Sequence, residues 1–372
     1  MSEIQSVKWL RALLGVHLNG HGARLEFLAR FILALLQVRT VNLSRLAVVC
    51  SSRAKVSSNY IRLQRFLREF VIDQAEIAQG VAALLPKDVP WILTLDRTNW
   101  KLGRVEINFL VLGVVYQGLA IPLFWTVLPK AGNSSTAERK ALLERYWQTF
   151  CGQPVAYLLG DREFIGKDWL VYLRQRGLPF RLRIKHNHTL TSKRGESYPL
   201  LREFRPLAIG QTRLLRQPRR LWGLEVFLSA KRLGQDEWLI LVSDTYSAHS
   251  LEEYAQRWSI ETLFAALKSH GFHLEDTGLT DPERLERLFA LLTLATLWAL
   301  HVGLWAHQHQ PIRQKKRSSD LSSASFATDS ISSSASSPNS TPLDPPFSLC
   351  WDSCWTDNPS RSNRISASCC PS

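Results

Sequence analysis

Three carboxylates occur in sequence contexts that could support metal chemistry. Asp96 ends the apolar run Trp91–Asp96, Asp161 follows the apolar run Val155–Leu159, and Glu261 lies in a helical pattern. Mg²⁺ prefers oxygen ligands and often retains waters beside carboxylates and phosphate oxygens. A pair of such ions can activate the attacking oxygen and stabilise the leaving oxygen in phosphoryl transfer. Because an aspartate at a strand end is more commonly a loop hydrogen-bonding group, the case depends on the combination.

Four residues around Glu261 share one face of a helix predicted over Leu251–Ser269. Tyr254, Arg257, Glu261 and Lys268 are spaced by 3, 4 and 7 residues. At about 100° per residue they fall within about 60° of one another. An exposed ion pair would explain Arg257 and Glu261. It would not explain an aromatic hydroxyl and a second cation on the same face.

The carboxylates need a scaffold that brings strand ends together, and the residues after a break at Pro86–Pro90 predict one. Strands, helices and their order follow from apolar runs and amphipathic patterns. The expected elements are strands Trp91–Asp96, Ile107–Tyr116 and Ile121–Leu128, helix Ser135–Phe150, strand Val155–Leu159, helix Lys167–Arg176, strand Phe180–Ile184, strands Gln211–Leu215, Gly223–Ala230 and Trp238–Ser243, and helices Leu251–Ser269 and Pro282–Ala306.

At these positions the sequence resembles the insertion-sequence transposases of the IS-four type. The spacing Tyr-x2-Arg-x3-Glu-x6-Lys is the signature of that family, and the four residues from Tyr254 to Lys268 meet it without a gap. The segment Leu95–Trp100 (LDRTNW) is similar to the first aspartate block of the family, and Leu159–Phe164 (LGDREF) to the second. The resemblance extends from about residue 20 to residue 315.

The resemblance implies a DDE transposase with an α/β fold. This fold is an RNase H-like mixed sheet with flanking helices, a β-rich insertion at about 187–247, and an all-α N-terminal region. The resemblance also implies that Asp96, Asp161 and Glu261 hold two Mg²⁺ ions, for which Mn²⁺ can substitute. Glu163 is near enough to be mistaken for a ligand, but the family match assigns that role to Asp161. The order of strands and helices predicted above agrees with this fold.

Cut-and-paste excision, usually through a DNA hairpin at the element end, is a further implication of the resemblance. Arg257 and Lys268 would grip phosphates near the scissile bond, and Tyr254 would hydrogen-bond a phosphate. Hairpin formation needs a flipped base stacked on an aromatic ring. The candidate rings, each more commonly a core side chain, are Trp222, Trp238 and Trp258. The implied partners are double-stranded DNA, as terminal inverted repeats and as target, and a second copy of the chain.

Residues 1–88 are predicted to form a helical DNA-binding region. In the segment Ser57–Phe70 the apolar residues share one face, and Arg62 and Arg65 lie on another. The two arginines are candidates for phosphate contacts, and a solvated helix face is the alternative. The chain has 46 Lys and Arg against 32 Asp and Glu, a net charge of +14. That balance favours a polyanionic partner, nucleic acid before an anionic membrane surface.

The cysteines and apolar runs bear on the compartment. Only Cys50 and Cys151 of the six cysteines precede residue 318, which favours a reducing environment, and no Cys/His spacing predicts a zinc site. We expect no signal peptide and no membrane association. The apolar run Leu288–Leu300 has 13 residues, fewer than the roughly 20 that a spanning helix needs. With the resemblance, these features predict a bacterial, cytoplasmic, nucleoid-associated protein.

The resemblance stops after Arg317. Residues 318–372 are rich in Ser, net acidic and without periodicity, which predicts a disordered tail. One choice of synonymous codons for Ser325–Ser333, read two bases later, encodes Phe-Arg-Tyr-Gly-Phe-Asp-Phe-Leu, which is similar to a stretch expected in the family's C-terminal segment. One hypothesis is therefore that the tail is an out-of-frame reading of that segment, and a genuine low-complexity tail is the alternative.

The sequence as a whole predicts three parts: a DNA-binding region at 1–88, a catalytic domain at 89–317 and the tail. The expected function is Mg²⁺-dependent DNA cleavage and strand transfer by cut-and-paste. The first alternative is a non-catalytic, decayed transposase that binds element-end DNA as an inhibitor. The second is a stand-alone nuclease with the same core.

Overall fold

The computed structural model describes residues 3–50, 54–86 and 89–309, so the predicted tail at 318–372 lies outside the described residues. The chain divides into two compact units. Among the described residues, one comprises 3–50, 54–86, 146–152 and 264–309, and the other comprises 89–145 and 153–263. The sequence-based division kept 89–317 together, whereas here residues 264–309 belong with the N-terminal helices.

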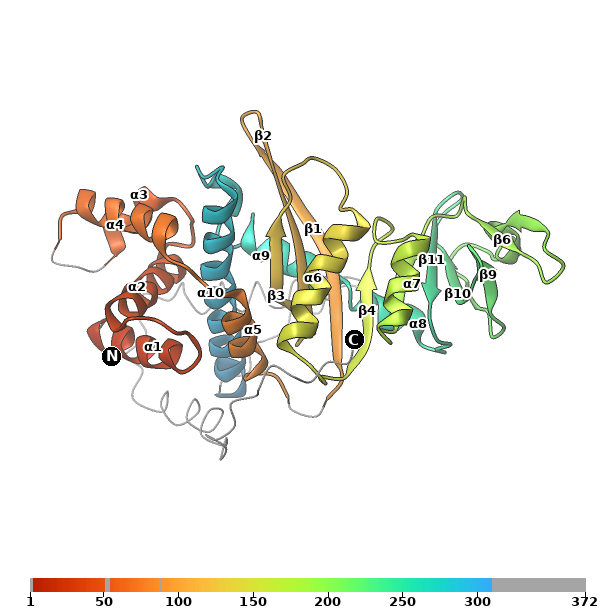
Figure 1. Cartoon of the computed structure of the whole chain (residues 1–372), viewed down its shortest axis with the longest axis horizontal. Helices are drawn as coiled ribbons and strands as arrows, with labels where there is room; N and C mark the ends of the chain where they lie inside the picture. The colour runs from red at the N-terminus through yellow and green to blue at the C-terminus, as the bar shows by residue number, and fades with distance from the viewer. Residues whose placement is uncertain (1–2, 51–53, 87–88, 310–372) are drawn as a thin grey trace. The chain divides into compact units, whose positions relative to one another are not determined.

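The first unit is helical. Helix α10 packs against α2, α4 and α5, and α1 packs against α2 and α5 (Figure 1). Leu28, Phe31 and Phe289 are fully buried in it, and the rings of Trp9 and Trp298 meet edge to face at 5.2 Å. Its described helices are α1 (Glu3–His17), α2 (Gly22–Val38), α3 (Leu43–Val49), α4 (Val56–Glu69), α5 (Gln74–Ala82) and α10 (Pro282–His309), with the 3₁₀ turn η2 (Leu274–Asp276).

Helix α10 is longer than the apolar run from which it was predicted. Its stretch Pro282–Trp305 is long and apolar enough to cross a bilayer. The expectation that the apolar segment here is too short to span a membrane was therefore wrong. More than half of the apolar window is buried inside the unit. The bent pair of α2 and α3 passes the same test if it is counted as one span. Core helices also pass such a test, so this finding is weak evidence for a membrane span.

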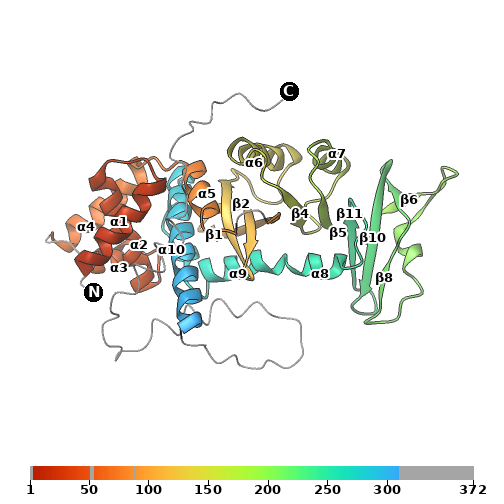
Figure 2. The same ribbon diagram turned by 90° about the horizontal axis from the view of Figure 1, so that it is seen from below.

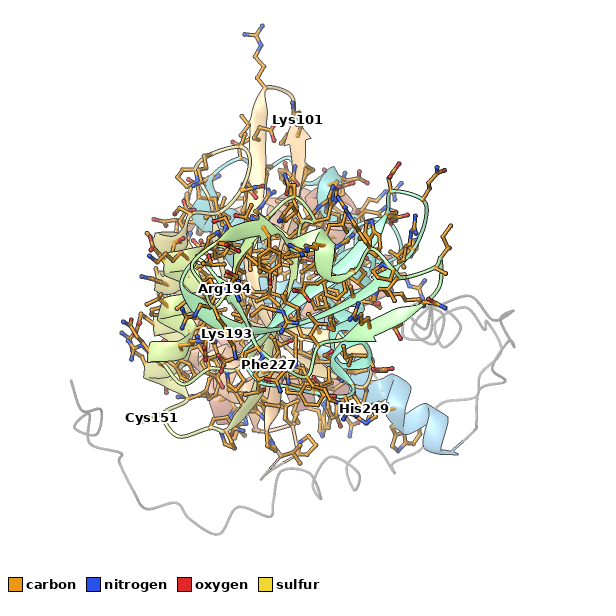
Figure 3. The ribbon with its side chains drawn as sticks, turned by 90° about the vertical axis from the view of Figure 1, so that its right-hand side faces the viewer. Lys101, Cys151, Lys193, Arg194, Phe227 and His249 are labelled. Carbon is orange, nitrogen blue, oxygen red and sulfur yellow. The ribbon has the colours of Figure 1, made fainter. Side chains whose placement is uncertain are left out.

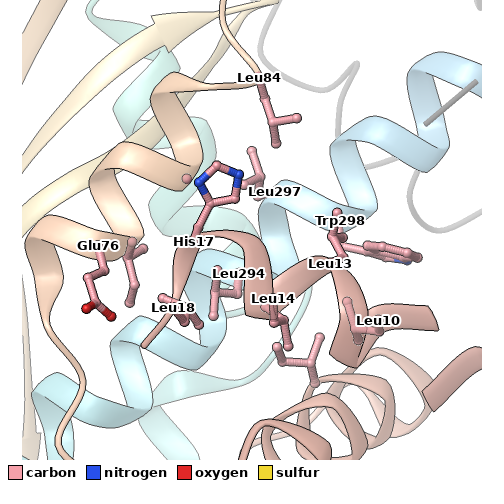
Figure 4. A pocket seen from close by; sticks show the side chains of 13 residues that line it. Leu10, Leu13, Leu14, His17, Leu18, Glu76, Leu84, Leu294, Leu297 and Trp298 are labelled. Carbon is pink, nitrogen blue, oxygen red and sulfur yellow. The ribbon is translucent and has the colours of Figure 1, made fainter. Parts of the chain in front are cut away.

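An apolar pocket lies among α1, α5 and α10 in this unit (Figure 4). Leucines from α1 and α10 line it, together with Trp298, His17 and Glu76. Burial lowers the pKa of His17, which favours the neutral imidazole in this apolar setting. The pocket therefore belongs to the core of the helical unit.

The second unit is built on a sheet of eleven strands. Its strands are β1 (Trp91–Leu102), β2 (Val105–Tyr116), β3 (Leu119–Val127), β4 (Val155–Gly160), β5 (Phe180–Ile184), β6 (Thr189–Thr191), β7 (Ser197–Pro199), β8 (Thr212–Leu214), β9 (Arg219–Leu221), β10 (Leu224–Arg232) and β11 (Trp238–Ser243). Its other elements are α6 (Thr136–Thr149), α7 (Lys167–Gln175), η1 (Leu200–Glu203), α8 (Ser250–Ala255) and α9 (Trp258–Leu267), of which α6 and α9 cross a boundary between the units.

The strand order is β3-β2-β1-β4-β5-β11-β10-β9-β6-β7, with β8 paired to β10. Strands β1, β2 and β3 are antiparallel neighbours, whereas β1, β4 and β5 run parallel. Helices α6 and α7 cover one face of this sheet, and α8 lies on the other (Figure 2). The parallel strands β1, β4 and β5 thus have helices on both faces, as buried parallel strands require.

Most of the predicted strands are confirmed, with one correction that concerns the site. The strand expected to end at Asp96 continues to Leu102, because β1 forms a long antiparallel hairpin with β2. The predicted strands Phe180–Ile184 and Trp238–Ser243 have the observed bounds of β5 and β11. The three-residue strands β6, β7 and β9 were not predicted, because three residues are too few to show an alternating pattern.

Candidate active site

The pairing of β1 with β4 brings two of the predicted carboxylates to neighbouring strands. Leu95 lies opposite Gly160 in parallel register, and it is the last residue of β1 that pairs with β4. Asp96 and Asp161 are the next residues on the two chains. Since parallel strands present their carboxyl ends at the same edge of a sheet, both aspartates lie at that edge.

Asp96 is a buried carboxylate with few compensating partners. Its side chain is 16% exposed, and its Oδ1 accepts a hydrogen bond from the backbone N–H of Arg97 at 2.7 Å. Burial raises the pKa of Asp96 to about 6, and the charges of Asp161 and Glu163 add to that rise. The hydrogen bond and the guanidinium of Arg257 oppose the rise without cancelling it. Such a site gains from a further positive charge.

Asp161 keeps a buried oxygen that accepts no hydrogen bond within the described part of the chain. This atom, Oδ1, lies 3.8 Å from Nη1 of Arg183, which is beyond hydrogen-bonding distance. The backbone carbonyl of Asp161 accepts from the N–H of Phe164, which closes a tight turn after β4. A buried carboxylate oxygen without a donor is costly unless something binds it.

The single helix predicted over Leu251–Ser269 is wrong, because the chain forms α8 and α9 with a two-residue break at Gln256 and Arg257. Around the break the backbone bonds tighten. The N–H of Arg257 donates to Tyr254 and that of Ile260 donates to Arg257, three residues back instead of four. The 100° periodicity used for the sequence argument therefore does not hold across the four signature residues.

Arg257 links two of the three predicted ligands. Its Nη1 donates to Oδ2 of Asp96 at 3.2 Å, and its Nη2 donates to Oε1 of Glu261 at 2.6 Å. The guanidinium is 7% exposed and lies near the rings of Tyr254 and Trp258, at 5.6 and 5.5 Å. Burial alone would lower the pKa of Arg257, but electrostatic interactions with Tyr254, Glu261 and Asp96 raise it. Arg257 is thus engaged by carboxylates, and contact with a phosphate remains a prediction.

The other signature residues differ in their surroundings. Tyr254 is buried with Tyr157, Leu159 and Leu241, and burial raises the pKa of its hydroxyl. Lys268 follows α9 directly, and its Nζ lies 2.8 Å from Oε1 of Glu275 within the helical unit. The structure therefore groups Tyr254 with Arg257 and Glu261. The DNA contacts predicted for Tyr254 and Lys268 stay predictions.

Glu163, which could be mistaken for a metal ligand, is held by another partner. Both of its carboxylate oxygens accept from Arg97, at 3.1 to 3.3 Å. Neither Arg97 nor this ion pair was predicted, because the two residues are 66 positions apart. The only available signal was that each lies close to a predicted ligand, Arg97 to Asp96 and Glu163 to Asp161.

The residues predicted to contact DNA elsewhere are placed as follows. Arg62 and Arg65 are exposed on α4, and the guanidinium of Arg62 lies 5.1 Å from the ring centroid of Phe27. Among the three candidate tryptophans, Trp258 is 52% exposed beside Arg257, whereas the other two, Trp222 and Trp238, are half-buried. Exposure favours Trp258 for stacking on a base.

The donor set fits a hard divalent ion. Asp96 and Asp161 offer carboxylate oxygens at one sheet edge, and no residue that the structure describes donates a hydrogen bond to Oδ1 of Asp161. Across the described residues, no three His, Cys, Asp or Glu side chains are arranged to hold a metal ion. The third carboxylate, Glu261, is engaged by Arg257, so its coordination would require that this bond opens.

Comparison with known proteins gives the family. The family model of the transposase DDE domain matches residues 89–298. This range includes Asp96, Asp161 and Glu261 and covers more than half of the 372 residues. No curated protein matches the chain significantly. DDE transposases act on DNA and generally use divalent metal ions. The chain therefore belongs to the DDE transposase family.

Proposed function

We propose that this chain is a Mg²⁺-dependent transposase of the IS-four type that cuts an insertion sequence from DNA and joins it to a target. The observation that carries the proposal is the relation of three acids. Asp96 and Asp161 follow paired residues of β1 and β4, and Arg257 connects Asp96 to Glu261. The family match and the signature spacing that ends in Lys268 support the same reading.

The strand order supports an RNase H-like core for this activity. Three antiparallel strands, β1 to β3, lie beside the parallel strands β4 and β5, with helices on both faces. The strands β6 to β10 lie between the second aspartate and Glu261, in the range expected for the β-rich insertion. We propose that these strands serve DNA binding, as does the helical region at 1–88.

The residues of the site have different chemical roles. Asp96, Asp161 and Glu261 would hold divalent ions, which supply charge stabilisation to the attacking and leaving oxygens of phosphoryl transfer when bound. Arg257 donates hydrogen bonds to both Asp96 and Glu261. When it is released, its guanidinium offers a bidentate donor to a phosphate. Trp258, exposed next to Arg257, is our choice for stacking a flipped base.

The non-catalytic alternative is not favoured. Asp96, Asp161 and Glu261 are all present, and none of these three ligand positions holds an apolar residue. A stand-alone nuclease would share the cleavage step and would lack strand transfer. We further propose a dimer on DNA, since transposition joins two element ends, and a cytoplasmic, nucleoid-associated location.

The test compares the wild-type chain with Glu261→Gln on a DNA duplex that carries the sequences flanking the gene. We expect the variant to lose strand cleavage with Mg²⁺, because an amide replaces one of the carboxylate ligands. Its Kd for the duplex should stay within about twofold of the wild-type value, since the other residues are unchanged. Glu252→Gln, at an exposed position of α8, is the matched control and should cleave normally. Equal cleavage by Glu261→Gln and the wild type would falsify the ligand role.

A further inference from the structure

A buried polar network lies beside the two aspartates and has no part in the reaction proposed above. Its centre is the pair of Arg97 and Glu163, whose side chains are 12% and 17% exposed. Nε and Nη2 of Arg97 both donate to the carboxylate of Glu163. Arg97 directly follows Asp96, and Glu163 lies two residues after Asp161. The pair thus ties together the two chain segments that carry the predicted ligands.

Asn108 extends the network to β2 and to the segment after β3. It is fully buried, and its Oδ1 accepts from Nη1 of Arg97 at 2.8 Å. Its Nδ2 donates to the backbone carbonyls of Lys130 and Gly132, at 2.9 and 3.0 Å. Both donors and the oxygen of the side-chain carboxamide group are therefore engaged, the oxygen in orienting Arg97 and the NH₂ group in holding the chain at 130–132.

A second layer holds Glu163 from the other side. Oγ of Ser134 lies 3.4 Å from Oε1 of Glu163, and it accepts from Nε of Arg139 at 2.9 Å. The guanidinium of Arg139 also lies 5.2 Å from the ring centroid of Phe164, the residue that follows Glu163. Arg139 and Ser134 are both almost fully buried. A buried polar network whose members are satisfied makes its surroundings rigid.

Such a network is more than is needed to join two strands, because backbone pairing already connects β1 to β4 up to Leu95 and Gly160. The β1–β4 pairing stops one residue before each aspartate, whereas Asp96 remains paired with Val111 of β2. The distance between Asp96 and Asp161 therefore depends on side chains beyond the β1–β4 ladder. A bidentate arginine–carboxylate pair fixes distance and angle together. Groups that orient metal ligands typically change metal affinity by about 10- to 100-fold when they are removed.

We propose that Arg97, Glu163 and Asn108 form a positioning clasp that sets the spacing of Asp96 and Asp161 for a divalent cation. The inference rests on the proposed function and concerns residues that touch neither the cation nor DNA. Arg97 and Glu163 act through their neighbours in sequence, and Asn108 acts by fixing Arg97. Because the three residues act as a unit, the effects of their substitutions on cation affinity should not be additive.

The experiment measures Mn²⁺ binding and DNA cleavage on the full-length chain for Glu163→Gln, Arg97→Gln and the double variant. Free Mn²⁺ is counted by electron paramagnetic resonance, and cleavage is measured as kcat and KM on the duplex from the gene flanks. Glu106→Gln is the matched control, because Glu106 makes an ion pair with the exposed Lys101 between β1 and β2. Lys101 is found in Figure 3 on the projecting β1–β2 hairpin.

We expect each single variant to raise the Kd for Mn²⁺ by about tenfold and to lower kcat with little change in KM for DNA. The double variant should be no worse than the more affected single variant, since both charges act through one contact. The control should match the wild type. Circular dichroism and thermal melting identify any variant that fails to fold, and the more conservative Glu163→Asp then replaces it.

Three outcomes decide the matter. Weaker Mn²⁺ binding with a kcat-specific loss in folded variants supports the clasp. Mn²⁺ binding and kcat equal to wild type in Glu163→Gln would overturn the clasp and leave the proposed function in place. A wild-type chain that binds no Mn²⁺ would overturn both, so the two failures are distinguishable.

Discussion

Leu95 lies opposite Gly160 in the parallel ladder of β1 and β4, and this pair is the last rung before the two aspartates. The rung has a steric consequence. A Cβ atom added at Gly160 would lie 3.0 Å from Cδ2 of Leu182 and 3.1 Å from Cβ of Phe164. Only glycine lets β4 lie this close to its neighbours, so Gly160 helps to fix where Asp161 begins.

The first prediction is that Gly160→Ala lowers the cleavage rate and destabilises the fold. The new methyl group must displace Phe164 or Leu182, which costs about 1–3 kcal/mol and shifts the turn that starts at Asp161. Urea unfolding and single-turnover cleavage measure the two effects. Gly278→Ala is the control, because nothing lies within 4 Å of a Cβ atom there. A Gly160→Ala protein with wild-type cleavage would show that the close approach does not position Asp161.

The sequence predicted the strands that carry the aspartates, because their apolar runs are buried in the sheet. It did not predict that β1 continues past Asp96, since the mostly polar segment from Arg97 to Lys101 owes its strand conformation to pairing with β2. Local patterns hold no information about such long-range pairing. The same limit explains why the ion pair of Arg97 and Glu163 was missed.

The signature helix shows another limit of sequence patterns. The spacing of Tyr254, Arg257 and Glu261 predicted a common face. In the structure Arg257 hydrogen-bonds Glu261 and lies near the ring of Tyr254. The prediction of one regular helix failed, because the break at Gln256 and Arg257 replaces four-residue backbone bonds by three-residue bonds. The residue spacing was informative, whereas the local helix geometry depended on tertiary contacts such as that of Arg257 with Asp96.

A second prediction concerns Arg257. In Arg257→Gln the carboxylates of Asp96 and Glu261 lose their shared cation, and breaking a buried ion pair from one side costs about 3 kcal/mol. We expect this loss in the free energy of unfolding at pH 8 with a chelator present. Arg104→Gln, an exposed position, should be neutral. Wild-type stability of Arg257→Gln would contradict a stabilising link between the two acids.

A third prediction is a pH dependence at Glu203, away from the active site. Hydrogen bonds from Arg219 hold the pKa of Glu203 below its ordinary value of 4.5, and the bond from Tyr198 acts in the same direction. A carboxyl with a lowered native pKa stabilises the fold above its unfolded pKa, and this stability is lost as the pH falls through the native value.

Glu203→Gln should therefore lower the free energy of unfolding by about 2 kcal/mol at pH 7, and the difference should shrink as the pH falls below 4.5. Thermal melting across that pH range measures it. The exposed Glu196→Gln serves as the reference variant. A difference between Glu203→Gln and wild type that stays constant from pH 7 to pH 3 would count against the ion pair as its cause.

A fourth prediction tests the exposed face of α4. Arg65→Ala should weaken DNA binding and reduce the dependence of log Kd on log salt by about one unit, as expected for one lost phosphate contact. Arg62→Ala is less clean, because the guanidinium of Arg62 also packs on Phe27. Gln64→Ala is the uncharged control on the same helix. An unchanged salt slope in Arg65→Ala would indicate a solvated face without DNA contact.

The most direct test of the three-acid site is to locate manganese by anomalous scattering in crystals of the full-length chain. Asp96, Asp161 and Glu261 should then surround the anomalous signal, with the carboxylate of Glu261 separated from Arg257. Glu163 should remain bound to Arg97. An anomalous signal on Glu163 instead of Asp161, or none at this sheet edge at saturating manganese, would contradict the account.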